Sequence, residues 1–256
     1  MLRTVREVAA FFFFLGRRAR KVRAFLLLGL LPVALAVLVR IVFAGRSGDV
    51  MSVFQDILMI YDLQFLAVIL TLFYGTSVCS EEIEGKTLPY LTTRPLSKSG
   101  IVIGKYLAYT ALAGLIVGLS LAASYLVMNG RRLGELSAWT ALLRYAGVLL
   151  LGLMAYMALF TFLGVLLKKS ILIGLAFGFG WETVIQYFPG STQRFSIVHY
   201  LKSLLPYYSP GKYSILMFRL EPTGPVAAVL ALVLITAVFL GLACLVFSLK
   251  EYMFED

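Results

Sequence analysis

The sequence is poor in the side chains on which most metal centres and hydrolases depend. It has two cysteines, Cys79 and Cys244, and a single histidine, His199. A structural zinc site usually takes four Cys or His ligands, and a two-histidine intramembrane protease centre needs a second histidine, so neither can be assembled. No Gly-x-Ser-x-Gly motif is present, which leaves a hydrolase nucleophile unsupported. These absences count against an enzyme.

Apolar sequence, by contrast, is abundant. Hydrophobic residues make up 61% of the 256, and the mean hydropathy is +0.92. A helix needs about 20 apolar residues to cross about 30 Å of hydrocarbon, and runs of that length recur along the chain. They predict six spans, at residues 24–43, 57–78, 101–128, 141–167, 171–188 and 225–249. Because these runs are too long and too continuously apolar for the alternating strands of a barrel, the predicted fold is an all-α membrane bundle.

A charged segment separates the second and third spans, at residues 81–98. It opens with Glu81, Glu82 and Glu84, continues through Thr and Pro, and ends in basic residues. An ionised side chain costs several kcal/mol in hydrocarbon, so the segment should lie in water beside the membrane. Carboxylates stabilise the N-terminal end of a helix, which predicts a short helix that begins at Glu81. An ordinary solvated loop is the alternative.

The order of residues in this segment resembles the ABC-2 type permease family, the membrane subunits of ATP-binding cassette exporters. Members carry Glu-x-Glu-x-Gly-Thr-Leu, a run of Leu, a Pro with a basic residue, and Gly-Lys at the start of the next span. The matching positions are Glu82, Glu84, Gly85, Thr87, Leu88, Leu91, Pro95, Lys98, Gly104 and Lys105. Lys86 stands where many relatives have Gly, but the hydropathy layout extends the resemblance across the chain.

The resemblance implies a cytoplasmic coupling helix that docks on a separate ATPase subunit. The residues assigned to this contact are Glu81, Glu82, Glu84, Gly85, Thr87, Leu88, Arg94 and Pro95. ATP and Mg would be bound by the ATPase, in two copies that serve a permease homodimer. No cofactor is expected on this chain itself. The stretch Gly100 to Tyr106 superficially looks like a phosphate loop, but it has one residue too few between its glycines and Tyr in place of Ser or Thr.

Basic residues near the ends of the spans predict the orientation of the chain. The cluster at residues 17–23 and the pair Lys168 and Lys169 fall on the side of the charged segment, and the opposite side receives fewer. Both termini are therefore expected in the cytoplasm, with the chain in the cytoplasmic (inner) membrane. The net charge of +10 is then explained by orientation and by attraction to anionic lipid, rather than by nucleic-acid binding. Both cysteines lie near cytoplasmic span ends, where a stable disulfide is not expected.

Two further segments are expected at the membrane surface. Residues 1–23 place an aromatic block between basic clusters, which predicts an interfacial helix, or simply a positive-inside anchor. Related permeases begin with such an elbow helix. The loop at 189–224 is apolar but broken by prolines, which predicts short re-entrant or interfacial helices. In relatives two such helices cap the outer mouth of the pathway, and an aromatic belt at the outer interface is the alternative.

Two carboxylates lie inside the predicted spans, Asp62 in the second and Glu182 in the fifth. Each is about six residues from the outer end of its span, which corresponds to a depth of about 9 Å. The resemblance implies that these spans line a pathway between protomers, faced by Tyr61, Asp62, Gln64, Glu182 and Gln186. The alternative is that one or both carboxylates are neutral, or are paired with Arg144 for structural reasons.

Taken with the resemblance, the sequence predicts a single permease domain over residues 1–256 that exports a substrate when a partner ATPase drives it. The alternative is a non-transporting subunit that transmits ATP-driven motion to a mechanical or signalling complex. The cargo stays open among lipids, drugs, peptides, glycans and ions.

Overall fold

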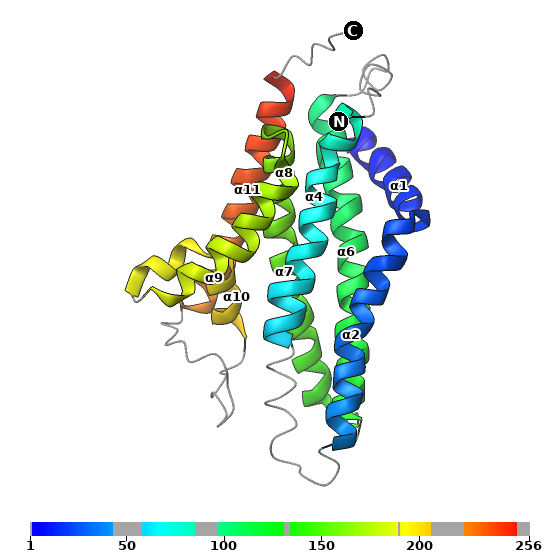
Figure 1. Cartoon of the computed structure of the whole chain (residues 1–256), viewed down its shortest axis with the longest axis vertical. Coiled ribbons are helices and arrows are strands. Elements are labelled where there is room, and N and C mark those ends of the chain that lie inside the picture. The colour runs from blue at the N-terminus through cyan, green and yellow to red at the C-terminus, as the bar shows by residue number, and fades with distance from the viewer. Residues whose placement is uncertain are drawn as a thin grey trace.

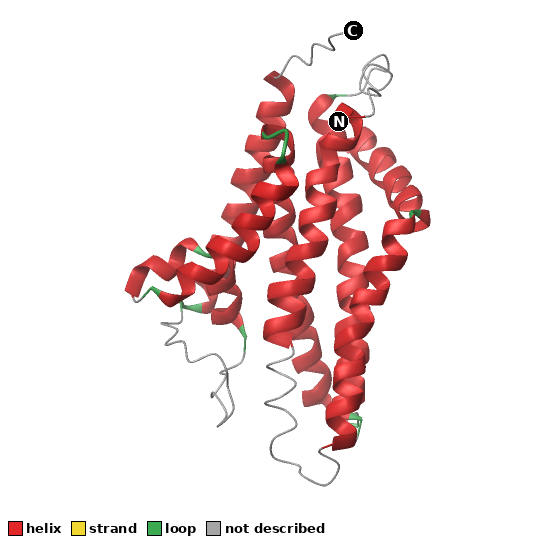
Figure 2. Ribbon diagram, viewed as in Figure 1, coloured by secondary structure: helices red, strands yellow, loops and turns green. Residues whose placement is uncertain are grey.

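The computed structural model describes residues 2–42, 58–84, 97–130, 134–188, 190–205 and 223–249. Within these ranges the ordered elements are all helices, with no β-strand (Figure 2), which confirms the predicted all-α class. Five of the described helices are long and apolar enough to cross a membrane: Lys21–Val42, Tyr61–Val78, Lys98–Asn129, Leu136–Leu166 and Pro225–Leu249. The fifth predicted span is instead a shorter apolar helix over Ser170–Val184. A six-span topology therefore stays a prediction.

The first two helices run side by side with a third helix from later in the chain. Helix α1 (Leu2–Arg18) leads directly into α2 (Arg20–Val42), and both pack along α6 (Lys98–Asn129) (Figure 1). Gly100 of α6 lies against Thr4, and Gly16 lies against Leu112. Helices α1 and α6 therefore run parallel to each other. At about 1.5 Å per residue the 32 residues of α6 extend about 48 Å, more than the hydrocarbon thickness, so α6 has room for both partners.

The outward face of α1 combines apolar and basic side chains. Phe11, Phe14 and Leu15 are exposed at the spacing of a single helix face, and the helix ends in exposed Arg17 and Arg18. This combination suits the boundary between lipid headgroups and acyl chains. The interfacial placement predicted for residues 1–23 stays a prediction.

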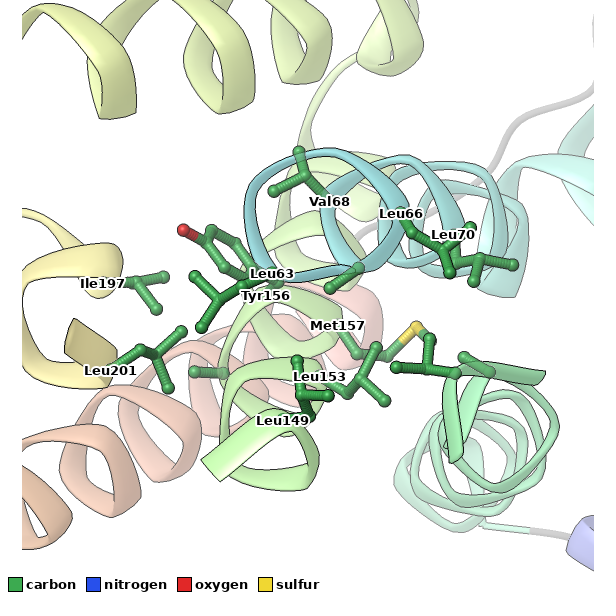
Figure 3. Packing of buried hydrophobic residues seen from close by; sticks show 14 of the residues in the cluster. Leu63, Leu66, Val68, Leu70, Leu149, Leu153, Tyr156, Met157, Ile197 and Leu201 are labelled. Atoms are coloured by element: carbon green, nitrogen blue, oxygen red, sulfur yellow. The ribbon is translucent and has the colours of Figure 1, made fainter. Parts of the chain in front are cut away.

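The centre of the bundle is the contact of α4 (Ala67–Glu84) and the preceding π-helix η1 (Leu58–Leu66) with α7 (Leu136–Leu166). Figure 3 shows their interdigitated apolar side chains, together with two from the short helix α10 (Ile197–Leu204): Leu63, Leu66, Val68, Leu70, Leu149, Leu153, Tyr156, Met157, Ile197 and Leu201. Two glycines let the backbones approach. A Cβ atom at Gly164 would lie 2.7 Å from the carbonyl oxygen of Thr76, and one at Gly75 would lie 2.8 Å from Cβ of Phe160.

The end of α4 corrects one sequence-based prediction. The helix continues to Glu84, so Glu81, Glu82 and Glu84 occupy its last turn, and the prediction of a new helix that begins at Glu81 is wrong. The reason is local, because no Gly or Pro stands between Gly75 and Glu84 to end the apolar helix earlier.

The chain after α7 changes helix type repeatedly. The elements are α8 (Ser170–Leu175), π-helix η2 (Ala176–Trp181), α9 (Glu182–Val184), the 3₁₀ turns η3 (Ile185–Tyr187) and η4 (Gly190–Phe195), α10, and then the long α11 (Pro225–Leu249). Gly174 and Gly178 let this chain approach α4, since Cβ atoms there would lie 2.4 Å from Leu72 and 2.6 Å from Val68. Helices η4 and α10 are short helices within the predicted loop at 189–224, and their re-entrant or interfacial placement stays a prediction. Residues 189 and 206–222 lie outside the described residues.

The glycine contact between α4 and α7 predicts that alanine substitutions at two glycines of α7 change stability by very different amounts. In Gly164→Ala the new methyl meets the backbone of Thr76, which no side-chain rotation can relieve, so the free energy of unfolding should fall by about 1–3 kcal/mol. Gly147 has no atom within 4 Å of its Cβ position, so Gly147→Ala should be neutral or slightly stabilising. Thermal midpoints in detergent measure both. Equal midpoints for the two variants would contradict the close contact.

Candidate functional site

The end of the second span that lies away from Glu84 is a π-helix, in which the backbone winds more widely than in an α-helix. Tyr61, Asp62 and Gln64 all lie in it. Stretches of π-helix in proteins are rare and frequently mark functional sites. The structure therefore places three of the predicted pathway residues in a locally unusual backbone.

Tyr61 makes a contact that is explained by a proline on another helix. Pro32 in the middle of α2 has no backbone N–H, so the carbonyl of Leu28, four residues earlier, loses its usual helical partner. The Tyr61 hydroxyl donates a hydrogen bond to this Leu28 carbonyl oxygen at 2.9 Å. The side chain thus ties η1 to α2 and satisfies an acceptor that the sequence of α2 leaves open.

Asp62 is fully buried and only partly satisfied. Its Oδ1 accepts a hydrogen bond from the Ser120 hydroxyl of α6 at 3.3 Å. Its Oδ2 is also buried and has no hydrogen-bond partner among the residues that the structure describes.

The polar side chains of the second and fifth predicted spans meet at two glutamines. Gln64 donates from Nε2 to Oε1 of Gln186 at 3.3 Å, and Lys202 of α10 donates to the same oxygen. The Gln186 side chain donates from Nε2 to the backbone carbonyl oxygen of Glu182. The backbone carbonyl oxygen of Gln186 accepts from Nε2 of Gln193 at 3.2 Å. The spans expected to come together are therefore joined by side chains, whereas whether these side chains line a pathway stays a prediction.

Glu182 has a different role from Asp62. Its carboxylate accepts hydrogen bonds from the Ser196 hydroxyl and from the backbone N–H groups of Ile197 at 3.0 Å and Val198 at 3.2 Å. These groups form the start of α10, where an anion is favoured by the unpaired N–H groups and the helix dipole. Glu182 is thus a cap for α10 supplied from 14 residues before its N-cap, Ser196.

Arg144 does not pair with either carboxylate. Its Nε and one terminal nitrogen donate to the carbonyl oxygen of Leu204 at 3.3 and 3.2 Å. This carbonyl is at the C-terminal end of α10, where a cation is favoured. The suggested pairing of Arg144 with Asp62 or Glu182 is therefore wrong, and α10 is instead held by a carboxylate at one end and a guanidinium at the other.

Lys202 lies in the same polar region as Glu182. Burial lowers the pKa of its ammonium group to about 8, and the negative charge of Glu182 partly opposes this shift. At neutral pH the group is still mainly charged, so it remains a donor to Gln186.

A second set of contacts lies near the charged end of α4. The buried Lys105 of α6 donates from Nζ to the carbonyl oxygen of Val78 at 2.9 Å, and the same atom lies 4.4 Å from the ring centre of Phe12 in α1. Gly104 beside it lets α1 approach, because a Cβ atom there would be 2.7 Å from Val8. The Gly104–Lys105 pair therefore joins α1, α4 and α6. Sequence analysis identified Gly104 and Lys105 only as part of the family motif and missed this packing role.

The residues assigned to the ATPase contact lie at the limit of what the structure describes. The backbone of Glu81, Glu82 and Glu84 belongs to the last turn of α4. Gly85, Thr87, Leu88, Arg94 and Pro95 lie outside the described residues.

Comparison with known families matches residues 14–183 to a family described as ABC-2 family transporter protein. The match covers more than half of the 256 residues, from within α1 to Thr183 in α9. No curated protein matches the chain.

The cap on α10 predicts a large stability effect at Glu182. In Glu182→Ala three buried donors lose their acceptor, and the free energy of unfolding should fall by about 3 kcal/mol. Glu135 is the matched control, since this exposed residue at the start of α7 accepts from Ser137 alone among the described residues. Glu135→Ala should therefore change stability by less than about 0.5 kcal/mol. Thermal midpoints measure both. A Glu182→Ala protein that transports poorly but is as stable as Glu135→Ala would assign Glu182 to the pathway instead.

Proposed function

The chain belongs to the ABC-2 family of transporter proteins, and from this membership we propose that it is the membrane-embedded permease subunit of an ATP-driven exporter. In this proposal a separate ATPase subunit, present in two copies, binds and hydrolyses ATP with Mg. Two copies of the permease form the pathway in the cytoplasmic membrane. The chain itself carries out no covalent chemistry.

The ends of the helices support a common cytoplasmic side. Figure 1 shows the start of α1, the end of α4, the start of α6 and the end of α11 gathered at one end of the bundle, together with the turn between α7 and α8. That turn carries the exposed Lys168 and Lys169. Arg3 and Arg6 belong to the first part of α1 at the same end, so the positive-inside rule favours the cytoplasm for this end.

The charges at the end of α4 support a contact with another chain. The backbone of Glu81, Glu82 and Glu84 forms the C-terminal turn of α4, the negative end of the helix dipole, where negative charge is unfavourable. The ammonium of Lys105 at the Val78 carbonyl offsets part of this within the chain. A basic surface on the ATPase would offset more, and this is the attraction that we assign to the coupling contact.

A push at this end of α4 has a direct route to the polar residues at the other end. Helix α4 continues without interruption into η1, which carries Tyr61, Asp62 and Gln64. Its backbone contact with α7 at Gly164 restricts motion to sliding or tilting of a packed pair. We assign Gln64 and Gln186 to the pathway, because their hydrogen bond joins the two spans and would break if the spans separated.

The coupling contact predicts an effect of charge reversal. In the double variant Glu82→Lys and Glu84→Lys the attraction to a basic ATPase surface becomes repulsion, so the ATPase activity that co-purifies with the permease should fall by about tenfold or more. The measurement is ATP hydrolysis by the complex purified from its native membrane through a tag on the permease.

Glu135→Lys is the control, because Glu135 is an exposed carboxylate at the start of α7, which lies beside the end of α6. The later part of α4 lies beside the start of α6 instead. It should leave the co-purified activity unchanged. If the double variant retained as much activity as Glu135→Lys, the contact would not be at the end of α4. Full activity with no substrate movement in the unaltered complex would favour a subunit that transmits motion without transport.

A further inference from the structure

Four buried threonines of the bundle share one hydrogen-bond pattern, which two buried serines of α6 do not follow. Thr71, Thr76, Thr110 and Thr161 each donate to the carbonyl oxygen four residues earlier in their own helix. Ser120 and Ser124 do not. Ser120 donates to Asp62, and the hydroxyl of Ser124 is buried with no hydrogen-bond partner among the residues that the structure describes.

The two serines lie on the same face of α6, and Ser120 contacts η1 through Asp62 and α2 through Gly29. They are one helical turn apart, so their side chains neighbour each other. Gly29 of α2 covers Ser120 without a side chain, since a Cβ atom there would already be 3.8 Å from Cβ of Ser120. Tyr61 beside Asp62 is fixed to the Leu28 carbonyl. Asp62, Ser120 and Ser124 therefore form a buried polar spot of η1 and α6 beside α2.

The charge in this spot is not compensated by any described basic side chain. Asp62 and Ser124 are completely buried, and the carboxylate is bonded only by Ser120. Arg40, the basic residue of α2 on this stretch of α6, donates instead to the carbonyl oxygens of Val127 and Met128. A buried ionised carboxylate is costly unless it is paired or coordinates a cation.

We propose that Asp62, Ser120 and Ser124 bind a monovalent cation, such as Na⁺, between η1 and α6. The three side chains offer two carboxylate oxygens and two hydroxyl oxygens, the hard ligands that such ions take, and one negative charge matches one positive charge. Among the described residues no three His, Cys, Asp or Glu side chains come together, so the spot lacks the ligands of a transition-metal site.

A bound cation would bridge the π-helix of the second span to α6. Its binding free energy would therefore favour the arrangement in which η1 packs on α6, and any movement of α4 that separates them would release the ion. This consequence does not depend on the cargo or on the direction of transport.

The test is the thermal midpoint of the purified full-length protein as NaCl replaces choline chloride at constant ionic strength and pH. The unaltered protein should show a saturable rise on the order of 3 °C. Asp62→Asn should lose the rise, and Ser124→Ala should raise the Na⁺ concentration for the half-maximal effect by about fivefold. Ser248→Ala is the control, since this exposed serine bonds only to its own helix and should behave like the unaltered protein.

Absence of a saturable rise in the unaltered protein would overturn the proposal, because Asp62 would then be neutralised without an ion. The same rise in all four proteins would overturn it as well, since Na⁺ would then act elsewhere. If Asp62→Asn does not fold, Ser124→Ala decides between these outcomes, because the Ser124 hydroxyl makes no hydrogen bond to a described residue that the substitution would break.

Discussion

The close approach of α4 to α7 is the constraint on which the rest of the bundle depends. Where Gly164 meets the backbone of Thr76, and Gly75 meets Phe160, the two helices are closer than any larger side chain would permit. Between lipid-embedded helices, packing of this kind is a main source of attraction, because lipid is as apolar as the side chains themselves. This packing holds α4 in a fixed position against α7. It therefore also positions the glutamate-bearing last turn of α4 and the polar π-helix η1 at its other end.

The two carboxylates inside the apolar segments have separate physical roles. Glu182 accepts three hydrogen bonds at the start of α10, so its charge is used to hold that helix in place. Asp62 has one donor and an open oxygen, although it is at least as deeply buried. Of the two carboxylates, only that of Asp62 has a buried oxygen with no described hydrogen-bond donor. The proposed cation site therefore includes Asp62 and not Glu182.

The sequence predicted the helical class and the approximate positions of five long helices, because long apolar runs leave helices as the only way to satisfy the backbone in lipid. It could not predict how far α4 continues, since three glutamates signal a helix start, yet nothing before them stops the helix. The sequence also could not predict that Glu182 caps α10, because this contact depends on how the chain folds back between Glu182 and Ser196, 14 residues later. Arg144 was paired with the wrong class of acceptor for the same reason: a basic side chain in an apolar run can bond to backbone carbonyls as well as to carboxylates.

The central claim is that the end of the bundle formed by the start of α1, the end of α4 and the turn between α7 and α8 faces the cytoplasm. The most direct measurement is labelling with a membrane-impermeant thiol reagent in a background with Cys79 and Cys244 replaced by Ser. Single cysteines are introduced by Lys168→Cys and Glu135→Cys, two exposed positions that flank opposite ends of α7. Glu135→Cys should react in intact cells, and Lys168→Cys only after the membrane is opened. The reverse pattern would place the carboxylates of α4 outside the cell, beyond the reach of any ATPase.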